Sequence, residues 1–251
     1  MNGTKGSTRI AAAAFLLVTI FLVAALVICQ ALPASADDKQ EANQLVEKAR
    51  LTLEGFINDN DMGAFHDLLK QAEGIFIAPQ LIKGAFIVGA LGGNGILLTR
   101  DKKNGKWTGP AFYTIGGASV GLQIGGQASE VILLVMTERG ITSLLGNSFK
   151  LGADAGIAAG PVGIGAAAAT ANLSADILSF SHSKGLYGGV SLEGAVVAVR
   201  AGLNNAYYGK EVSPEDILVR QGVRNPQALK LIETISKGRM QGSAQNKPKT
   251  G

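Results

Sequence analysis

Hydrophobic and polar positions divide most of the chain into a helical part, a strand-like part and a second helical part. Over residues 40–71 apolar residues recur at helical spacing, and the polar run at residues 58–61 separates a long helix from a short one. The apolar side of this long helix suits packing on a protein core. The alternative is a helix lying on a membrane surface, which the mixed charges of its polar side disfavour.

Residues 74–209 show a different pattern, in which short apolar runs alternate with turn signals. Runs of this length and composition predict β-strands, and Asn104-Gly105 predicts a hairpin over residues 101–106. One helix is expected over residues 137–147. The expected strands cover residues 75–78, 85–91, 96–99, 111–115, 131–136 and 195–199, and period-two alternation adds 149–157 and 178–183.

Glycine is concentrated in this strand-rich region. The chain has 34 glycines, and 26 of them lie within residues 74–209. Glycines inside strands permit tight bends and close backbone contact, so they favour a strongly curved sheet. We therefore predict an α+β fold in which a glycine-rich, barrel-like antiparallel sheet is flanked by N-terminal and C-terminal helices.

The same patterns give an expected domain organisation. Helix signals return at Ser213-Pro214 and Asn225-Pro226, and the last residues are polar. The expected parts are a signal peptide at 1–36, N-terminal helices at 37–71, a β-rich domain at 72–220, a C-terminal helix at 221–237 and a disordered tail at 238–251.

The first residues have the pattern of a secretory signal peptide. Lys5 and Arg9 precede an uncharged apolar run over 10–29, and Ala34-Ser35-Ala36 offers a cleavage site after Pro33. Cleavage there predicts an exported protein, either periplasmic or secreted. We also expect this protein to associate with a membrane. Because the apolar run is also long enough to span a bilayer, an uncleaved anchor is the alternative.

Charge and cysteine content change when this segment is removed. The net charge of +4 falls to +2 without Lys5 and Arg9, and the single cysteine, Cys29, is lost as well. A nearly neutral chain does not have the charge of a general nucleic-acid binder, and one cysteine excludes a disulfide framework. The sequence thus predicts no nucleic-acid partner.

Catalytic and cofactor motifs are weak. Gly117-Ala118-Ser119-Val120-Gly121 matches the hydrolase pattern, with His182 as a conceivable base oriented by Asp154 or Asp176. That pattern needs a strand, a sharp turn and a helix, whereas the residues after it look like further strand. The two histidines lie far apart, so neither predicts a metal site. We expect no enzyme activity, no cofactor and no metal.

A cluster of cations is the strongest candidate binding feature. Basic residues and the only tryptophan gather on the expected hairpin, and two further lysines lie beside glycines. Cations next to an interfacial aromatic residue suit anionic head groups, although a hairpin that is polar for solubility is the simpler alternative. The candidate lipid-binding residues are Lys83, Arg100, Lys102, Lys103, Lys106, Trp107 and Lys184.

Several sequence blocks over residues 72–219 together resemble the SYLF domain family, also called the Ysc84 actin-binding or Las17-binding family. The blocks are Gly74-Ile75-Phe76-Ile77-Ala78-Pro79, Lys83-Gly84, Pro110-Ala111-Phe112-Tyr113, Gly121-Leu122-Gln123-Ile124-Gly125, Phe149-Lys150-Leu151-Gly152-Ala153-Asp154, Ala159-Gly160-Pro161-Val162-Gly163, Ser181-His182-Ser183-Lys184-Gly185-Leu186, Gly189-Val190-Ser191-Leu192-Glu193-Gly194 and Ala206-Tyr207-Tyr208-Gly209. With its signal peptide the chain looks like a secreted bacterial branch of that family.

The resemblance implies binding rather than catalysis. Members of the family bind phosphoinositides, and some bind actin filaments, but the actin property transfers poorly to an exported chain. The expected function is therefore an exported lipid-binding domain that contacts anionic phospholipid or phosphoinositide-like head groups. The alternative is a non-enzymatic envelope module with a structural or protein-interaction role, including actin binding by family analogy.

Overall fold

The computed structural model describes residues 34–59, 62–85, 88–120, 125–161, 174–183 and 186–245. The predicted signal peptide lies almost entirely outside these residues, as does Lys184. One compact unit begins at Asp38 and contains all the strands and nearly all the helical residues described below.

A nine-stranded sheet forms the centre of the described fold. Its strand order is β5-β9-β3-β2-β1-β4-β7-β6, with β8 paired to β7. All pairings are antiparallel except that of β6 with β7. The strands are β1 Gly74–Ala85, β2 Val88–Arg100, β3 Trp107–Val120, β4 Gly125–Val135, β5 Ser148–Lys150, β6 Ile157–Ala159, β7 Ile177–Ser183, β8 Leu186–Gly189 and β9 Val196–Val199.

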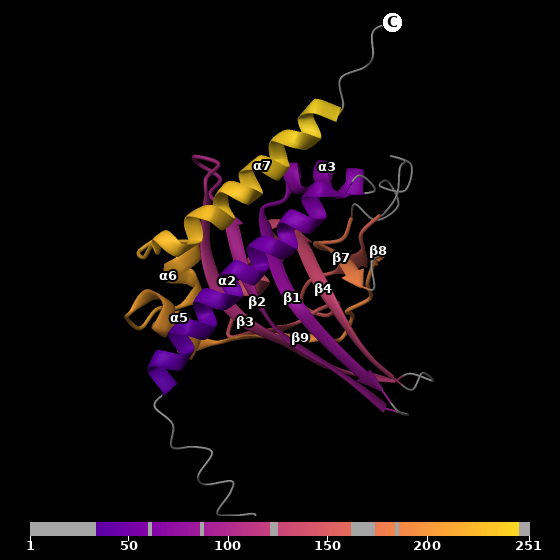
Figure 1. Ribbon diagram of the computed structural model, residues 1–251, viewed down its shortest axis with the longest axis horizontal. Coiled ribbons are helices and arrows are strands. Elements are labelled where there is room, and N and C mark those ends of the chain that lie inside the picture. Colours follow the sequence, from indigo (N-terminus) through magenta and orange to yellow (C-terminus); the bar gives the residue numbers. More distant parts are fainter. Residues whose placement is uncertain are drawn as a thin grey trace, which may run out of the picture. The chain divides into compact units, whose positions relative to one another are not determined.

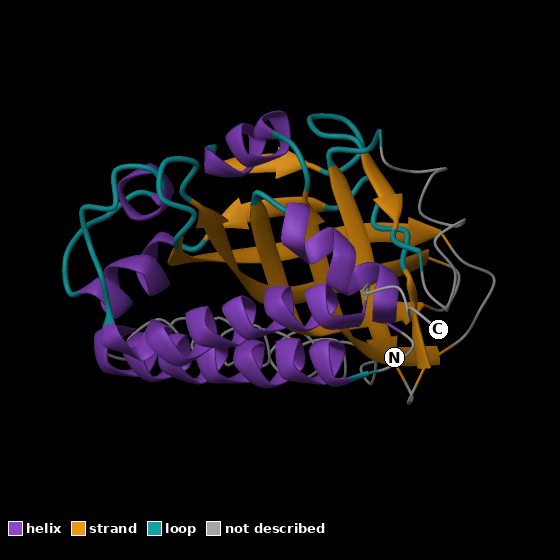
Figure 2. Cartoon of the chain, turned by 90° about the horizontal axis from the view of Figure 1, so that it is seen from above, coloured by secondary structure: helices purple, strands orange, loops and turns teal. Residues whose placement is uncertain are grey.

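Helices precede, interrupt and follow the sheet. Figure 1 shows the long helices α2 and α7 crossing one side of the central strands, and Figure 2 shows the same helices from above. The helices are α2 Ala34–Asn58, α3 Gly63–Gln71, α4 Glu138–Leu145, α5 Ala201–Tyr208, α6 Pro214–Leu218, the 3-10 turn η3 Pro226–Ala228, and α7 Leu229–Gln245.

Both faces of the central strands are buried. Along β1, Ile75 and Ile77 join a core shared with α2, α3 and α7, while Phe76 and Ala78 join a second core on the opposite face. Successive strand side chains point to opposite faces, so a strand covered on both sides needs an uninterrupted apolar run. This explains why the sequence is apolar at every position from Ile75 to Ala78 and from Val131 to Val135.

The predicted fold class is confirmed by this arrangement. Leu45, Ala49, Leu53 and Phe56 of α2 are buried in the helix-side core. This confirms that the first long helix packs on the core, and its apolar side is therefore not available to a membrane. At the other end, α7 continues past residue 238 into the stretch predicted to be a disordered tail.

The strands are longer than the sequence pattern predicts. The runs expected at 75–78 and 96–99 are parts of β1 and β2, which pair continuously through their glycines apart from one irregularity near Pro79. The single strand expected over 85–91 is wrong, because β1 ends at Ala85 and β2 begins at Val88, and residues 86–87 lie outside the described part of the chain. The glycines do not end the strands here, and several of them allow close packing instead. A Cβ atom on Gly95 would lie 2.5 Å from Cζ of Phe76 and 2.9 Å from the carbonyl oxygen of Ile77.

The single strand expected over residues 149–157 is wrong. The chain instead forms β5, turns, and begins β6, because Gly152 adopts a positive φ of 85° and the Asp154 carboxylate accepts a hydrogen bond from the Lys150 amide at 2.6 Å. Strands β5 and β6 are the two ends of the strand order. A turn of a few residues can join them only if the sheet curves strongly, which agrees with the expected barrel-like shape.

We predict that Gly95→Ala destabilises the protein by about 1–3 kcal/mol, because the new methyl group would overlap Phe76 in a filled core. Urea unfolding at neutral pH measures the loss. Gly84→Ala is the matched control, since a Cβ there meets nothing within 4 Å. Equal stability of the two variants would contradict the packing role of Gly95.

Candidate functional site

The predicted hairpin between β2 and β3 is present and is organised by Asp101. Its carboxylate accepts hydrogen bonds from the Lys103 amide at 2.7 Å and from the side chains of Asn104 and Gln221, both at 2.8 Å. The bond from the Lys103 amide is the main cause of a lowered pKa of Asp101. Gly105 closes the turn with a φ of 70°, which explains the Asn-Gly signal.

The lysines of this hairpin differ in their surroundings. Lys102 bonds Glu138 at 3.0 Å and lies 3.6 Å from Glu73, and the bond to Glu138 is the main cause of its raised pKa. Lys103 and Lys106 are exposed, and neither forms an ion pair within the described residues. The free positive charge of the hairpin thus resides on Lys103 and Lys106.

Trp107 and Arg100 lie at the base of the hairpin and not at its tip. The indole is only 5% exposed and belongs to the helix-side core, so in this conformation it presents no ring to a membrane. Arg100 pairs with Trp107 across the two strands, and its backbone amide bonds the Glu73 carbonyl at 2.8 Å. Their closeness in sequence predicted a shared surface, whereas helix packing covers the tryptophan.

Lys83 lies at the opposite end of the sheet. It is exposed on β1, and its Cα pairs with that of Leu91 on β2. From Leu91 to Arg100 the strand β2 extends by roughly 30 Å, since each strand residue adds about 3.3 Å. Lys184 is outside the described residues. The structure therefore brings Arg100, Lys102, Lys103, Lys106 and Trp107 together at one hairpin but separates Lys83 from them.

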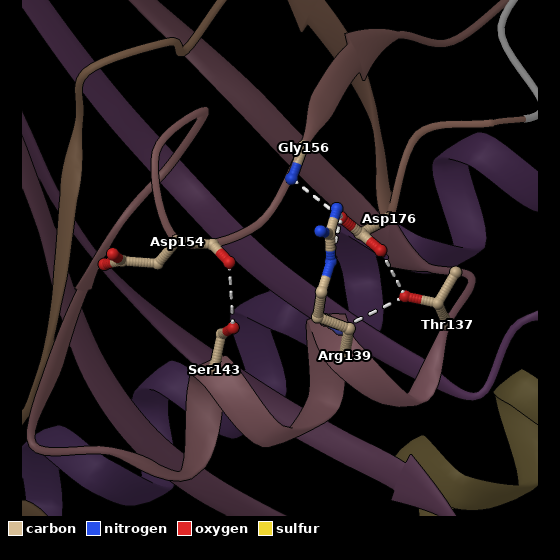
Figure 3. A network of polar contacts seen from close by, with 7 residues as sticks. Thr137, Arg139, Ser143, Asp154, Gly156 and Asp176 are labelled. Atoms are coloured by element: carbon tan, nitrogen blue, oxygen red, sulfur yellow. Dashed lines mark hydrogen bonds and ion pairs between the residues drawn. The ribbon is translucent and has the colours of Figure 1, made fainter.

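The residues of the hydrolase alternative have other partners. Figure 3 shows the Asp176 carboxylate accepting hydrogen bonds from Thr137, Arg139 and the Gly156 amide, the last at 2.8 Å. These contacts, mainly the Arg139 bond, lower the pKa of Asp176 to about 2. Asp154 belongs to the turn after β5, where its carbonyl accepts from Ser143. Both aspartates thus hold local structure, whereas Nδ1 of His182 lies 2.8 Å from a carboxylate oxygen of Glu130.

Ser119 lies within β3, where its Cα pairs with that of Gly89, so it does not occupy a strand-to-helix elbow. Among the described residues no group of three His, Cys, Asp or Glu side chains is placed to hold a metal ion. Within the same residues no helix has the length and apolar character needed to cross a membrane.

A groove that the sequence did not predict runs between α2 and the far half of the sheet. It consists of two adjoining hollows of about 440 and 260 Å³, which share Lys48, Pro79 and Gln80. The pairing of β1 with both of its neighbours shifts register at Pro79, and beyond this point the strands extend past the helices (Figure 1). The groove begins where the helices stop covering the sheet.

The groove combines exposed apolar side chains with an ordered polar floor. Leu51 lines the larger hollow and is 53% exposed, and Ile82 lines the smaller one and is 55% exposed. On the floor, one Glu130 oxygen accepts from Thr52 at 2.8 Å and the other lies 2.8 Å from Nδ1 of His182. A polar cluster in one hollow and an exposed apolar side chain in each hollow are suited to a protein segment that carries apolar side chains.

Comparison with known proteins supports the resemblance seen in the sequence. Residues 116–238 match the family described as Las17-binding protein actin regulator, Ysc84. The chain belongs to this Ysc84, or SYLF, family. The family match extends into α7, so it includes a helix that completes the core on one face of the sheet.

Named relatives come from animals and yeast. The human SH3 domain-containing YSC84-like protein 1 is 32% identical over 170 residues, which is 67% of this chain and 49% of the relative. The Saccharomyces cerevisiae LAS seventeen-binding protein 3 is 30% identical over 192 residues, or 73% of this chain and 41% of the relative. The chain thus spans about half the length of the curated relatives it matches.

We predict that Asp176→Asn lowers the free energy of unfolding by about 2 kcal/mol at pH 7, because a carboxyl with a depressed pKa stabilises the fold above its unfolded pKa. This contribution is lost as pH falls from about 4 towards 2, so the difference from the original protein should shrink there. Urea unfolding at pH 7 and pH 3 measures it.

Asp67→Asn is the matched control, because the Asp67–Lys70 pair is exposed. Such a pair contributes about 0.5 kcal/mol or less. A similar loss in both variants would mean that the network around Asp176 has no special stabilising role.

Proposed function

We propose that this chain is a non-enzymatic protein-interaction module that binds a protein partner in the groove between α2 and the far half of the sheet. The observation that carries the proposal is a pair of exposed apolar side chains, Leu51 of α2 and Ile82 of β1, one in each of the two adjoining hollows of the groove. Both residues belong to regular elements, so the groove is largely preformed and binding costs little ordering entropy.

The charges of the groove favour a protein over a polyanion. Glu41 is paired with Arg200 at 2.5 Å, and Glu130 is bonded to Thr52 and His182, so the acids on the walls are already engaged. Lys48 is one isolated cation between them. Such a surface offers apolar contact and hydrogen bonds without the strong positive field that a polyanion requires.

The family description supports a partner of the actin system. It names a Las17-binding protein and an actin regulator, and a yeast relative carries the Las17-binding name itself. By analogy, we propose actin filaments as the first partner to test. The export expected from the N-terminal segment decides which proteins the chain meets, but it does not alter the chemistry of the groove.

We predict that Leu51→Ser combined with Ile82→Ser weakens co-sedimentation with actin filaments about tenfold or more. Each change removes an exposed apolar anchor from the groove, and losses of this size are typical of such anchors. Sedimentation at several filament concentrations measures the apparent Kd.

Val219→Ser is the control, because Val219 is 52% exposed but lies just after α6 and outside the groove. Binding that is unchanged in the groove variant would refute the groove as the docking site. A chain that binds no filaments at all would refute actin as the partner.

We also propose lipid binding as a second function, supported by a different observation. Lys103 and Lys106 are exposed at one hairpin and make no ion pair within the described residues. Two unneutralised cations on a protruding turn attract an anionic bilayer surface, each by about 1 kcal/mol at low salt. Phosphoinositide-like head groups are one form of such a surface.

We predict that Lys103→Glu with Lys106→Glu reduces flotation with vesicles containing anionic phospholipid and leaves actin co-sedimentation unchanged. Lys102→Gln should have a smaller effect, because Lys102 is already paired with Glu138. Flotation at low and high salt measures the binding, which should weaken as salt screens the charges. Equal flotation of all variants would contradict a role for the hairpin.

A further inference from the structure

A second cavity lies at the base of the hairpin, away from the groove. It has a volume of about 390 Å³ and is enclosed by the β2–β3 hairpin, the loop after α6 and the first turns of α7. Its size falls in the range of small-molecule sites, which are cavities of about 300–1,000 Å³. None of its lining residues lines the groove.

The wall of this cavity carries only positive formal charges. Lys106, Arg224 and Arg239 line it, and no Asp or Glu does. Lys106 and Arg224 form no ion pair within the described part of the chain. Asp101 accepts hydrogen bonds from Gln221, which lines the wall, and from the Lys103 amide, so its carboxylate is already engaged in the hairpin. A wall that carries Lys106 and Arg224 without an ion pair, and no acid, favours an anion.

Arg239 lies deepest among these cations. Its Nη2 donates to the Lys70 carbonyl at 3.0 Å, a neutral acceptor. Burial, together with the nearby charge of Arg100, lowers the pKa of Arg239. Arg239 adds positive charge to the wall of the cavity.

The rest of the wall combines polar side chains with an apolar part. Leu229, on the first turn of α7, is 57% exposed, and Ile232 and Val223 also line the cavity. Trp107 also lines the cavity, and its indole Nε1 is buried without a hydrogen-bond partner among the described residues. An acceptor that reaches this donor after a small side-chain movement would satisfy it. Apolar surface beside cations fits a molecule with an apolar body and an acidic end.

We propose that this cavity binds a small amphipathic anion, a carboxylate or phosphate monoester that carries a short apolar chain. The acidic group is held by Lys106, Arg224 and Arg239, and the chain lies on Leu229 and Ile232. The ligand is a single molecule inside the fold, so this site differs from a membrane surface met by the hairpin tip. It is also independent of the groove proposed for a protein partner.

Trp107 provides the readout, because it is the only tryptophan in the chain and lines the cavity. The full chain is titrated with octanoate and with octyl phosphate, below the concentrations at which they form micelles, and indole fluorescence is recorded. We expect a saturable change with at least one of them. Acetate, which lacks the chain, and 1-octanol, which lacks the charge, should each bind at least about tenfold more weakly.

Matched variants distinguish binding in the cavity from general attraction by surface charge. Arg224→Gln should weaken octanoate binding about tenfold, because it removes one charge-assisted hydrogen bond. Lys103→Gln removes an exposed cation of the same hairpin that does not line the cavity, and it should leave binding unchanged. Leu51→Ser, in the groove, should also bind normally.

Three results would overturn the proposal. The first is no saturable fluorescence change with either anion, and the second is equal weakening by Arg224→Gln and Lys103→Gln. The third is a response only to vesicles of anionic phospholipid, which would assign the effect to a membrane surface. Failure of the actin experiment leaves this test unaffected, because the two sites share no residue.

Discussion

Burial of the central strands on both faces is the constraint on which the rest of this structure depends. Each side chain of β1 from Ile75 to Ala78 enters one of two cores, so a shift of register by one residue would exchange the two sets. One core requires the helices α2, α3 and α7 as its cover, and the other requires the sheet to curve around itself. The helices and the curvature therefore follow from the same apolar run.

The candidate binding surfaces lie where the strands are no longer buried on both faces. At Pro79 the register of β1 shifts against both neighbours, and Ile82 just beyond it is exposed, whereas Ile77 just before it is fully buried. At the other end of β2 the hairpin emerges from under α7, which leaves Trp107 covered and Lys106 exposed. Binding features thus occur at both ends of the strands, while the middle serves stability.

The sequence predicted the fold class better than the sites. The apolar run 131–136 and the Asn104-Gly105 turn depend on neighbouring residues alone, and the structure has a strand that ends at Val135 and a hairpin at these places. The groove depends on Leu51 and Ile82, which line its two adjoining hollows only because α2 crosses β1, and no local sequence pattern predicts that crossing. Trp107 illustrates the same limit, since its polar sequence neighbours suggested exposure and α7, more than a hundred residues later, covers it.

The helix-side core joins the two ends of the folded unit. Leu45 and Leu53 of α2 share it with Leu231 and Ile235 of α7, and a Cβ on Gly238 would press against Ile57. The apolar side of α2 is therefore covered by three different parts of the fold, namely the strands, α3 and α7. Without α7 the sheet could still pair, but the core on this face would be incomplete, so the two helices at the ends of the folded unit depend on each other for stability.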